Sequence, residues 1–353
     1  MTAPKEASEF RTQIDEQLSS FVAAQRTRLA ELGPDLVPFI DAAADFVSGG
    51  KRLRPEFCHA GWLVAGGDPA DPGIIAASAA FEWLQGSALA HDDLMDDSDT
   101  RRGKPSIHRA FEAGHRDAGG AGDAAQFGRS TAVLLGDLML SWADECLRGA
   151  ADLSPVIADN LGRAFGYFDL CKTEVVAGQF LDVVGQTRTG FSVEEAMRVV
   201  RFKSAKYTIE RPLHVGAAFA GADEAVLEAL SAFGIPLGEA FQLRDDVLGV
   251  FGDPGVTGKP AGDDLREGKR TVLIARTAEL TDDAGRDLLH RGLGNADHIG
   301  ELRDLITSTG AAEAVERDIE ALERQAESAL ETFDASTQVH LQGLLLKATR
   351  RTH

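Results

Sequence analysis

The sequence predicts an all-α fold. Segments rich in Ala, Leu, Val and Glu recur with helical periodicity, short groups of Gly, Pro or Asp separate them, and β-branched runs of strand length are scarce. A chain of 353 residues is long enough to bury a large core. Because no linker separates regions of different composition, we expect one domain over residues 1–353, built as a single large helical bundle.

The expected helices follow in order along the chain. In the first half they cover residues 6–32, 36–48, 53–66, 72–96, 104–113, 128–149 and 153–185. In the second half they cover residues 192–203, 205–221, 223–249, 269–279, 283–292, 298–310 and 311–333. Ser154 before Pro155 is a favoured helix start, with a capping hydroxyl and a proline at the first helical position. Gly114, Gly119, Gly120 and Gly122 predict a flexible surface loop over about 112–128.

Composition limits the classes of function. A net charge of −20 disfavours binding to nucleic acid, whose phosphates the protein would repel. Cys58, Cys146 and Cys171 form no C-x-x-C pair, which favours a reducing compartment. The polar N-terminus lacks the apolar core of a signal peptide, and no apolar run is long enough to span a bilayer. We therefore expect a cytoplasmic protein with no transmembrane segment.

Three aspartates near residue 92 form the first candidate site. Asp92 and Asp96 are one helical turn apart, so both side chains can reach the same hard metal ion. Asp93 lies between them, and the surrounding residues are largely apolar. The alternative is a solvated acidic helix face, which the apolar neighbours disfavour because a charge near a core needs a partner. The pattern indicates Mg²⁺ that holds a phosphorylated substrate.

Two basic patches suit phosphate groups. Arg101 and Arg102 follow the acidic cluster, and guanidinium groups match phosphate oxygens through paired hydrogen bonds. Lys51 and Arg54 follow two glycines just before an expected helix start, where backbone N–H groups favour an anion. Ordinary surface basic residues are the alternative for both patches.

A second acidic cluster contains Asp245 and Asp246 on an expected helix. The loop after it carries Lys259 and Lys269, which suit the neutralisation of phosphate. A Gly-x-x-Gly-Lys pattern invites comparison with a P-loop. However, the segment follows a helix, and Pro260 stands where a P-loop needs Ser or Thr.

These motifs, in this order, resemble those of the trans-isoprenyl diphosphate synthases, or polyprenyl synthetases, and most closely a bacterial geranylgeranyl diphosphate synthase. The resemblance covers nearly the whole chain and rests on Gly49–Pro55, His91–Asp96, Arg101–Gly103, Gly136-Asp137, Gly178-Gln179 with Asp182, Lys203-Ser204, Phe241–Asp246, Gly258-Lys259 and Gly268-Lys269. It implies the isoprenoid synthase fold, in which helices pack around a deep central cavity, and usually a homodimer.

The resemblance also implies roles for individual residues. Asp92 and Asp96 would bind two Mg²⁺ ions and Asp245 a third. The allylic diphosphate would be held by Arg101, Lys203, Lys259 and Lys269, and isopentenyl diphosphate by Lys51, Arg54, Gln85 and Arg102. Phe241, Gln242 and the backbone of Lys203-Ser204 would line the carbocation that forms when the allylic diphosphate ionises.

The chain departs from the family pattern at three positions. Gly249 ends the second cluster where many members have Asp. Either Asp253 or Asp263 compensates, or the third ion depends on Asp245 alone. Gln85 replaces a common His, and Ser204 replaces a common Thr and keeps its hydroxyl.

The helix before Asp92 predicts the product length. Ala88 lies about 6 Å and Phe81 about 16 Å before Asp92, both on nearly the same face. Ser87 and Ala88 are too small to block a growing chain, whereas Phe81 can form a floor after roughly three or four isoprene units. We expect geranylgeranyl diphosphate, with farnesyl and farnesylgeranyl diphosphate as alternatives.

Other functions remain open from the sequence. A terpene cyclase also ionises allylic diphosphates on an Asp-rich helix, but it needs no isopentenyl site. A catalytically silent partner subunit would typically lose its acidic motifs, and here only Gly249 departs. A di-iron carboxylate bundle would need Glu-x-x-His signatures, which are not found near either cluster.

Overall fold

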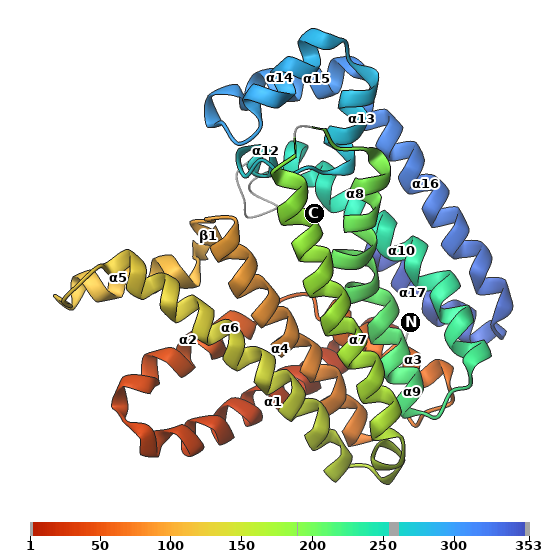
Figure 1. Ribbon diagram of the computed structural model, residues 1–353. Helices are drawn as coiled ribbons and strands as arrows, with labels where there is room; N and C mark the ends of the chain where they lie inside the picture. The colour runs from red at the N-terminus through yellow and green to blue at the C-terminus, as the bar shows by residue number, and fades with distance from the viewer. Residues whose placement is uncertain (1–2, 189, 254–260, 350–353) are drawn as a thin grey trace. The chain divides into compact units, whose positions relative to one another are not determined.

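The computed structural model describes residues 3–188, 190–253 and 261–349, which are helical apart from one short hairpin and the connecting turns (Figure 1). The predicted all-α fold is confirmed. The chain divides into two compact units. The first unit comprises Met1–Phe165 and His214–Ala222, and the second comprises Gly166–Leu213 and Asp223–His353.

The first unit is built around two long helices. Its elements are α1 (Ala3–Leu29), α2 (Val37–Val47), α3 (Leu53–Val64), α4 (Pro72–Met95), the strands β1 (Thr100–Arg101) and β2 (Lys104–Pro105), α5 (Ile107–Asp117), α6 (Ala124–Gly149) and the start of α7 (Pro155–Gln186). Short 3₁₀ turns lie at Ala30–Leu32, Pro34–Leu36 and Ala150–Asp152. Helices α4 and α6 pack along each other, and an edge-on contact of Trp83 with Trp142 at 5.1 Å lies in their interface.

Helix α4 starts where its sequence favours a start. Asp71 caps it by accepting a hydrogen bond from the Gly73 amide at 2.7 Å, and Pro72 takes the first helical position. Ser154 donates to the second oxygen of Asp71 at 2.6 Å and caps α7 by accepting from the Ile157 amide. The predicted Ser154 cap is confirmed, and it also ties the start of α7 to the start of α4.

The second unit holds the remaining helices. They are the rest of α7, α8 (Val193–Val199), the π-helix η4 (Val200–Glu210), the start of α9 (Arg211–Phe219), α10 (Glu224–Phe251), α12 (Asp263–Arg266), α13 (Val272–Leu280), α14 (Asp283–Gly292), α15 (Ile299–Thr309), α16 (Ala311–Ala329) and α17 (Ala335–Thr349). Short 3₁₀ turns lie at Ala296–His298 and Leu330–Thr332. Its core includes Val200, Leu243, Leu273, Ile306 and Val315.

Three sequence predictions need correction. A helix over 104–113 was expected, but β2 takes its first residues and α5 begins at Ile107. The expected break between 203 and 205 is absent, because helical structure continues from Val193 through η4 into α9. A π-helix has no 3.6-residue period, so the apolar pattern across it looks interrupted. Helix α17 was not predicted.

The predicted loop over 112–128 is much shorter than expected. Helix α5 continues to Asp117 and α6 starts at Ala124, so residues 118–123 connect them. Gly119 and Gly122 have positive φ in this turn. Gly128 has another purpose, because a Cβ there would lie 2.1 Å from the His108 carbonyl oxygen. It therefore lets α6 pack closely on α5, and glycine here signals close packing rather than flexibility.

Across the three described stretches of the chain, we find no helix with the length and hydropathy needed to cross a bilayer.

Candidate active site

The first acidic cluster lies at the C-terminal end of α4. The Asp96 amide donates to the Asp92 carbonyl at 2.9 Å, so the two residues are one helical turn apart, as the sequence predicted. Both side chains are partly exposed, whereas Asp93 is only 1% exposed. The last turn of a helix carries partial negative charge and favours cations. Hard carboxylate oxygens at this position fit a divalent ion such as Mg²⁺.

Asp93 has a separate task that the sequence did not reveal. It accepts a hydrogen bond from Arg101 Nε at 2.9 Å, and Arg101 Nη2 also contacts it. The same Nη2 lies 3.9 Å from Asp92 Oδ2. Asp93 therefore holds the guanidinium of Arg101, on strand β1, beside Asp92.

Gly136 and Asp137 of α6 position a ring next to this cluster. A Cβ on Gly136 would lie 2.2 Å from His91 Nε2, so only glycine leaves room for the imidazole. His91 Nε2 lies 3.4 Å from Asp137 Oδ1. The same nitrogen lies 3.3 Å from the Val133 carbonyl oxygen, so α6 holds the ring of the residue that immediately precedes Asp92.

Arg102 lies against the glycine turn that precedes α3. A Cβ on Gly50 would be 3.5 Å from Arg102 Nη2, and Arg102 Nη1 lies 3.5 Å from the Ser48 carbonyl oxygen. Burial lowers the pKa of Arg102, and this effect exceeds the opposing attraction of Glu82. Repulsion lowers the pKa further and comes from Arg52, Arg101 and Arg54. Such a concentration of positive charge favours a bound anion.

Arg52 anchors this turn to the core. It is 2% exposed, has a left-handed φ of 53°, donates to Asp15 Oδ1 at 2.9 Å through Nε, and pairs with the buried Glu82. Lys51, by contrast, is exposed, and Arg54 is partly exposed. The sequence showed three cations without separating them, and burial now distinguishes the anchor from the two candidates for ligand binding.

Along α4, exposure changes below the acidic cluster. Ala88 and Gln85 are partly exposed, although they lie in the middle of a largely buried helix. Phe81 is completely buried. Ser87 is also buried, and its helical position lies about 140° around the axis from Asp92. Ala88, Gln85 and Phe81 therefore share the face of Asp92, and Ser87 does not.

In the second unit, Lys203 and Ser204 lie on η4, and π-helical segments often occur at functional sites. Lys203 Nζ donates to Asp182 Oδ2 at 2.6 Å. A Cβ on Gly178 of α7 would lie 2.4 Å from the Lys203 nitrogen. Gly178 and Asp182, one turn apart on α7, therefore hold Lys203 through its backbone and its ammonium group.

The second acidic cluster lies on α10. Gln242 Nε2 donates to Asp246 Oδ1 at 2.7 Å. Burial and the nearby carboxylate of Asp264 raise the pKa of Asp246 well above its usual range. Asp246 is 6% exposed, whereas Asp245 is partly exposed. Of the two adjacent aspartates, Asp245 is the better placed to hold a metal ion.

Two carboxylates flank Lys269. Its Nζ lies 2.5 Å from Glu267 Oε2 and 3.8 Å from Asp264 Oδ1. The sequence did not indicate a role for Glu267 or Asp264. Lys259, the other lysine predicted in this loop, lies outside the described residues.

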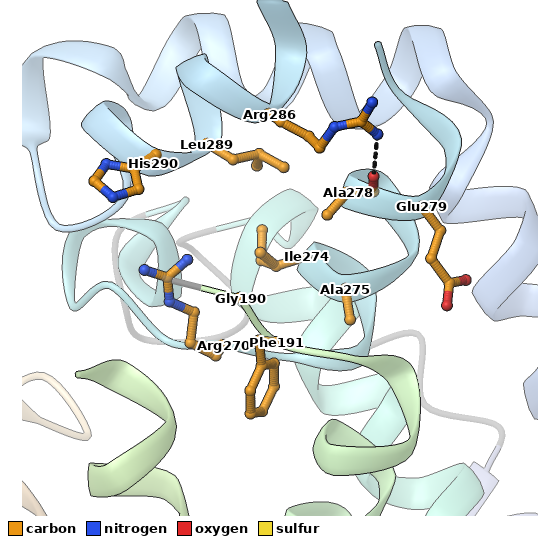
Figure 2. A pocket seen from close by; sticks show the side chains of 10 residues that line it. All are labelled: Gly190, Phe191, Arg270, Ile274, Ala275, Ala278, Glu279, Arg286, Leu289 and His290. Carbon is orange, nitrogen blue, oxygen red and sulfur yellow. Dashed lines mark hydrogen bonds between the residues drawn. The ribbon is translucent and has the colours of Figure 1, made fainter. Parts of the chain in front are cut away.

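A separate pocket of about 270 Å³ lies in the second unit between α13, α14 and the segment before α8 (Figure 2). Phe191, Ile274, Ala275 and Leu289 make it largely apolar. Arg270, next to Lys269 in sequence, also lines it. None of the predicted site residues within the described part of the chain lines this pocket.

Helix-borne aspartates accompanied by arginine or lysine suit a divalent ion and phosphate groups, which indicates an enzyme that acts on phosphorylated substrates. Comparison with known proteins gives the family. A model of the family described as "Polyprenyl synthetase" matches residues 38–308. The chain belongs to the polyprenyl synthetase family and is a trans-prenyltransferase that makes prenyl diphosphates.

Three relatives show how similar the chain is to known proteins, and the names of these relatives give three different products. The crystal structure of a geranylgeranyl pyrophosphate synthase from Corynebacterium glutamicum, complexed with isoprenyl diphosphate and magnesium, is 39% identical with a TM-score of 0.92, over 97% of this chain and 99% of that chain. A (2E,6E)-farnesyl diphosphate synthase from Mycobacterium tuberculosis is 35% identical over 68% of this chain and 60% of its own length. A geranylfarnesyl diphosphate synthase from Aeropyrum pernix is 29% identical over 86% and 87%.

Proposed function

We propose that this trans-prenyltransferase condenses isopentenyl diphosphate with an allylic diphosphate and stops at geranylgeranyl diphosphate. The observation that supports this product length is the change in side-chain exposure along α4. Ala88 and Gln85 are partly exposed below Asp92, and Phe81 is fully buried. Phe81 lies about 16 Å along the helix from Asp92, which suits roughly three or four isoprene units. The likeness to the Corynebacterium enzyme supports the same product.

The proposed cofactor is Mg²⁺, with two ions held by Asp92 and Asp96 and a third by Asp245. The hard oxygen donors and the negative helix end support this choice, as does the magnesium in the Corynebacterium complex. When bound, Mg²⁺ would neutralise the charge of the leaving diphosphate. Asp93 and Asp182 have a different part, because they hold Arg101 and Lys203 in place.

Two groups of cations would hold the two substrates. For the allylic diphosphate, we propose Arg101, Lys203, Lys259 and Lys269. For isopentenyl diphosphate, we propose Lys51, Arg54, Arg102 and Gln85. Burial, and after it repulsion from Arg52, Arg101 and Arg54, lowers the pKa of Arg102, and a bound diphosphate would offset both effects. Fixed positive groups stabilise the charge that develops as the allylic C–O bond breaks.

The residues that line the reacting carbons would be Phe241, Gln242 and the backbone of Lys203-Ser204. Gln242 is oriented by its hydrogen bond to Asp246. An aromatic face and oriented dipoles stabilise a carbocation without forming a bond to it. The isopentenyl double bond then attacks the cation, and the proton that leaves goes to the departing diphosphate.

Product analysis tests the activity. The purified protein is incubated with Mg²⁺, isopentenyl diphosphate and each allylic primer of five, ten or fifteen carbons, and the products are separated by chromatography. We expect the twenty-carbon diphosphate from every primer that is accepted. A fifteen- or twenty-five-carbon end product would identify the farnesyl or farnesylgeranyl alternative. Diphosphate release without isopentenyl diphosphate would favour a terpene cyclase, and no condensation by the pure protein would favour a silent partner subunit.

Replacing Phe81 by a smaller residue tests the floor. Phe81→Leu and Phe81→Ala are expected to lengthen the product by one or more isoprene units, because they open the face of α4 below Gln85. Trp83→Phe is the matched control, since Trp83 faces Phe21 and Trp142 on the other side of the helix. An unchanged product from folded Phe81 variants would remove Phe81 as the floor.

We propose a homodimer in the cytoplasm, with both compact units forming one domain. The family match crosses both units, which supports one domain.

Val176 and Phe180 of α7, one turn apart, are each 66% exposed, which supports burial against a second copy. The three cysteines are buried and form no disulfide, in accord with a reducing compartment. Light scattering should give twice the chain mass, and Phe180→Glu should shift it towards the monomer.

A further inference from the structure

The separate pocket in the second unit has a preformed apolar wall (Figure 2). Ile274 and Ala278, one turn apart on α13, line it together with Leu289 of α14. Phe191 adds an aromatic ring, and a Cβ on Gly185 of α7 would lie 2.9 Å from its Cε2 atom, so α7 supports that ring at close range. The pocket volume of about 270 Å³ equals that of about nine water molecules at roughly 30 Å³ each, which suits an apolar group of about nine non-hydrogen atoms.

Most of the charged side chains that line this pocket already have partners. The charged or titratable lining residues are Arg270, Glu279, Arg286 and His290. Arg286 donates to Asp283 Oδ1 at 2.8 Å, and Glu279 accepts from Arg276 Nη1 at 3.2 Å. His290 is exposed on α14. Neither Arg286 nor Glu279 therefore leaves an uncompensated charge in the pocket.

Arg270 differs from these neighbours. Its Nε is buried and has no hydrogen-bond partner, and no ion pair joins its guanidinium to any residue that the structure describes. Burial lowers the pKa of Arg270, because a charge in apolar surroundings loses hydration. In Figure 2 the guanidinium lies on the same side of the pocket as the ring of His290, away from Glu279. An apolar wall thus adjoins a positive charge that an anion would stabilise.

We propose that this pocket binds a small carboxylate, with an apolar body of about nine non-hydrogen atoms against the wall and its carboxylate group paired with Arg270. A guanidinium matches a carboxylate through two parallel hydrogen bonds. A single uncompensated cation favours a ligand with one negative charge, unlike the several cations assigned above to each diphosphate. The inference goes beyond the proposed function and does not depend on it.

Calorimetry with three simple probes tests the ligand class. Octanoate carries both the charge and the apolar chain, octan-1-ol lacks the charge, and acetate lacks the chain. The full-length protein is first saturated with Mg²⁺ and unreactive thiolodiphosphates, so that the diphosphate sites are occupied. At about pH 8 a carboxylate is ionised and an ordinary histidine is neutral. We expect octanoate to bind in a one-to-one ratio, and each of the other probes to bind at least about tenfold more weakly.

Removing the charge of Arg270 tests its role. Arg270→Gln is expected to weaken octanoate binding by about tenfold or more, the usual effect of losing a hydrogen bond to a charged group. Arg291→Gln is the matched control, because Arg291 is an exposed arginine beside His290 that does not line the pocket. Its affinity for octanoate should stay within about twofold of the parent.

Filling the apolar part is an independent test. Ala278→Leu adds volume inside the pocket and leaves Arg270 unchanged. Because Ala278 is partly exposed, the larger side chain can be accommodated without overpacking the core. We expect this variant also to lose octanoate binding by about tenfold or more, since the chain and the new side chain would compete for the same volume. Thermal unfolding checks that each variant is folded.

The inference fails if the parent protein does not bind octanoate, or if folded Arg270→Gln and Ala278→Leu both bind it as the parent does. Octyl phosphate separates a carboxylate site from a phosphate site, and binding about tenfold tighter than that of octanoate would overturn the choice of carboxylate. If Arg270→Gln does not fold, Ala278→Leu and the comparison of octanoate with octan-1-ol decide. None of these results bears on the synthase function, which the condensation assay tests separately.

Discussion

Adjacent aspartates in this chain differ because of what surrounds them. Asp92 is partly exposed at the end of α4, whereas Asp93 is buried and holds Arg101. On α10 the same division recurs, with Asp245 partly exposed and Asp246 buried under Gln242. In each pair one carboxylate is partly exposed, and its buried neighbour contacts an adjoining side chain.

For the individual residue Asp92, we predict that Asp92→Ala lowers turnover by about three orders of magnitude, since metal stabilisation of a leaving group contributes several kcal/mol. The rate of product formation at saturating Mg²⁺ measures it. Asp152→Ala, an exposed aspartate of the same unit, serves as the control and should retain full rate. An Asp92→Ala protein with normal turnover would contradict the assignment of the metal site.

Among the secondary-structure elements, glycines determine how closely helices approach. Gly178 brings α7 onto the backbone of η4, and Gly238 of α10 does the same, since its Cβ would lie 2.6 Å from the Ala205 Cα. The segment that carries Lys203 and Ser204 is therefore held between two helices at backbone distance. Close packing on both sides fixes η4 against α7 and α10 within the second unit.

Gly178→Ala on α7 is predicted to destabilise the protein by about 1–3 kcal/mol, because the methyl group would overlap the Lys203 backbone on η4. Denaturant unfolding gives the free energy, and the allylic substrate's KM should rise as Lys203 shifts. Gly166→Ala on the same helix is the control. Its Cβ would meet nothing within 4 Å, so it should be neutral or stabilise by up to about 1 kcal/mol. Equal effects of the two changes would argue against the close approach.

Across the whole molecule, the buried cysteines report on global unfolding. Burial raises the pKa of both the Cys58 and the Cys146 thiols to about 12. In an unfolded chain a thiol has a pKa near 8.5. Because the folded protein keeps these thiols neutral, their contribution to stability is complete below about pH 8.5 and is lost as the pH rises from there towards 12.

We therefore predict that the free energy of unfolding falls between about pH 8.5 and the folded-state pKa values. Cys58→Ala with Cys146→Ala should have a flatter profile over this range. Thiol-reactive probes at pH 8 should label neither cysteine until denaturant unfolds the protein. Rapid labelling of the native protein would show that the core around α4 and α6 opens without unfolding.

Most helices and much of the candidate site could be predicted from the sequence, because the forces that determine them are local. Helical periodicity gave most helices, and the Ser154 cap and the one-turn spacing of Asp92 and Asp96 were confirmed. The errors arose where contacts distant in sequence decide the structure. The loop over 112–128 was predicted too long, because the sequence does not show that α5 and the start of α6 pack against each other at Gly128. The π-helix η4 has no sequence period of its own to detect.

The sequence alone determined the helical class, the family motifs and the chemical types of the candidate residues, because these depend on residue identity and short spacing. Only the tertiary structure decided which of two neighbouring charges is buried and which faces outward. It separated Arg52 from Lys51 and Arg54, and Asp93 from Asp92. It also brought Asp264 into the space beside Gly249, fifteen residues away, because a glycine backbone lets α12 approach α10 more closely than any side chain would allow.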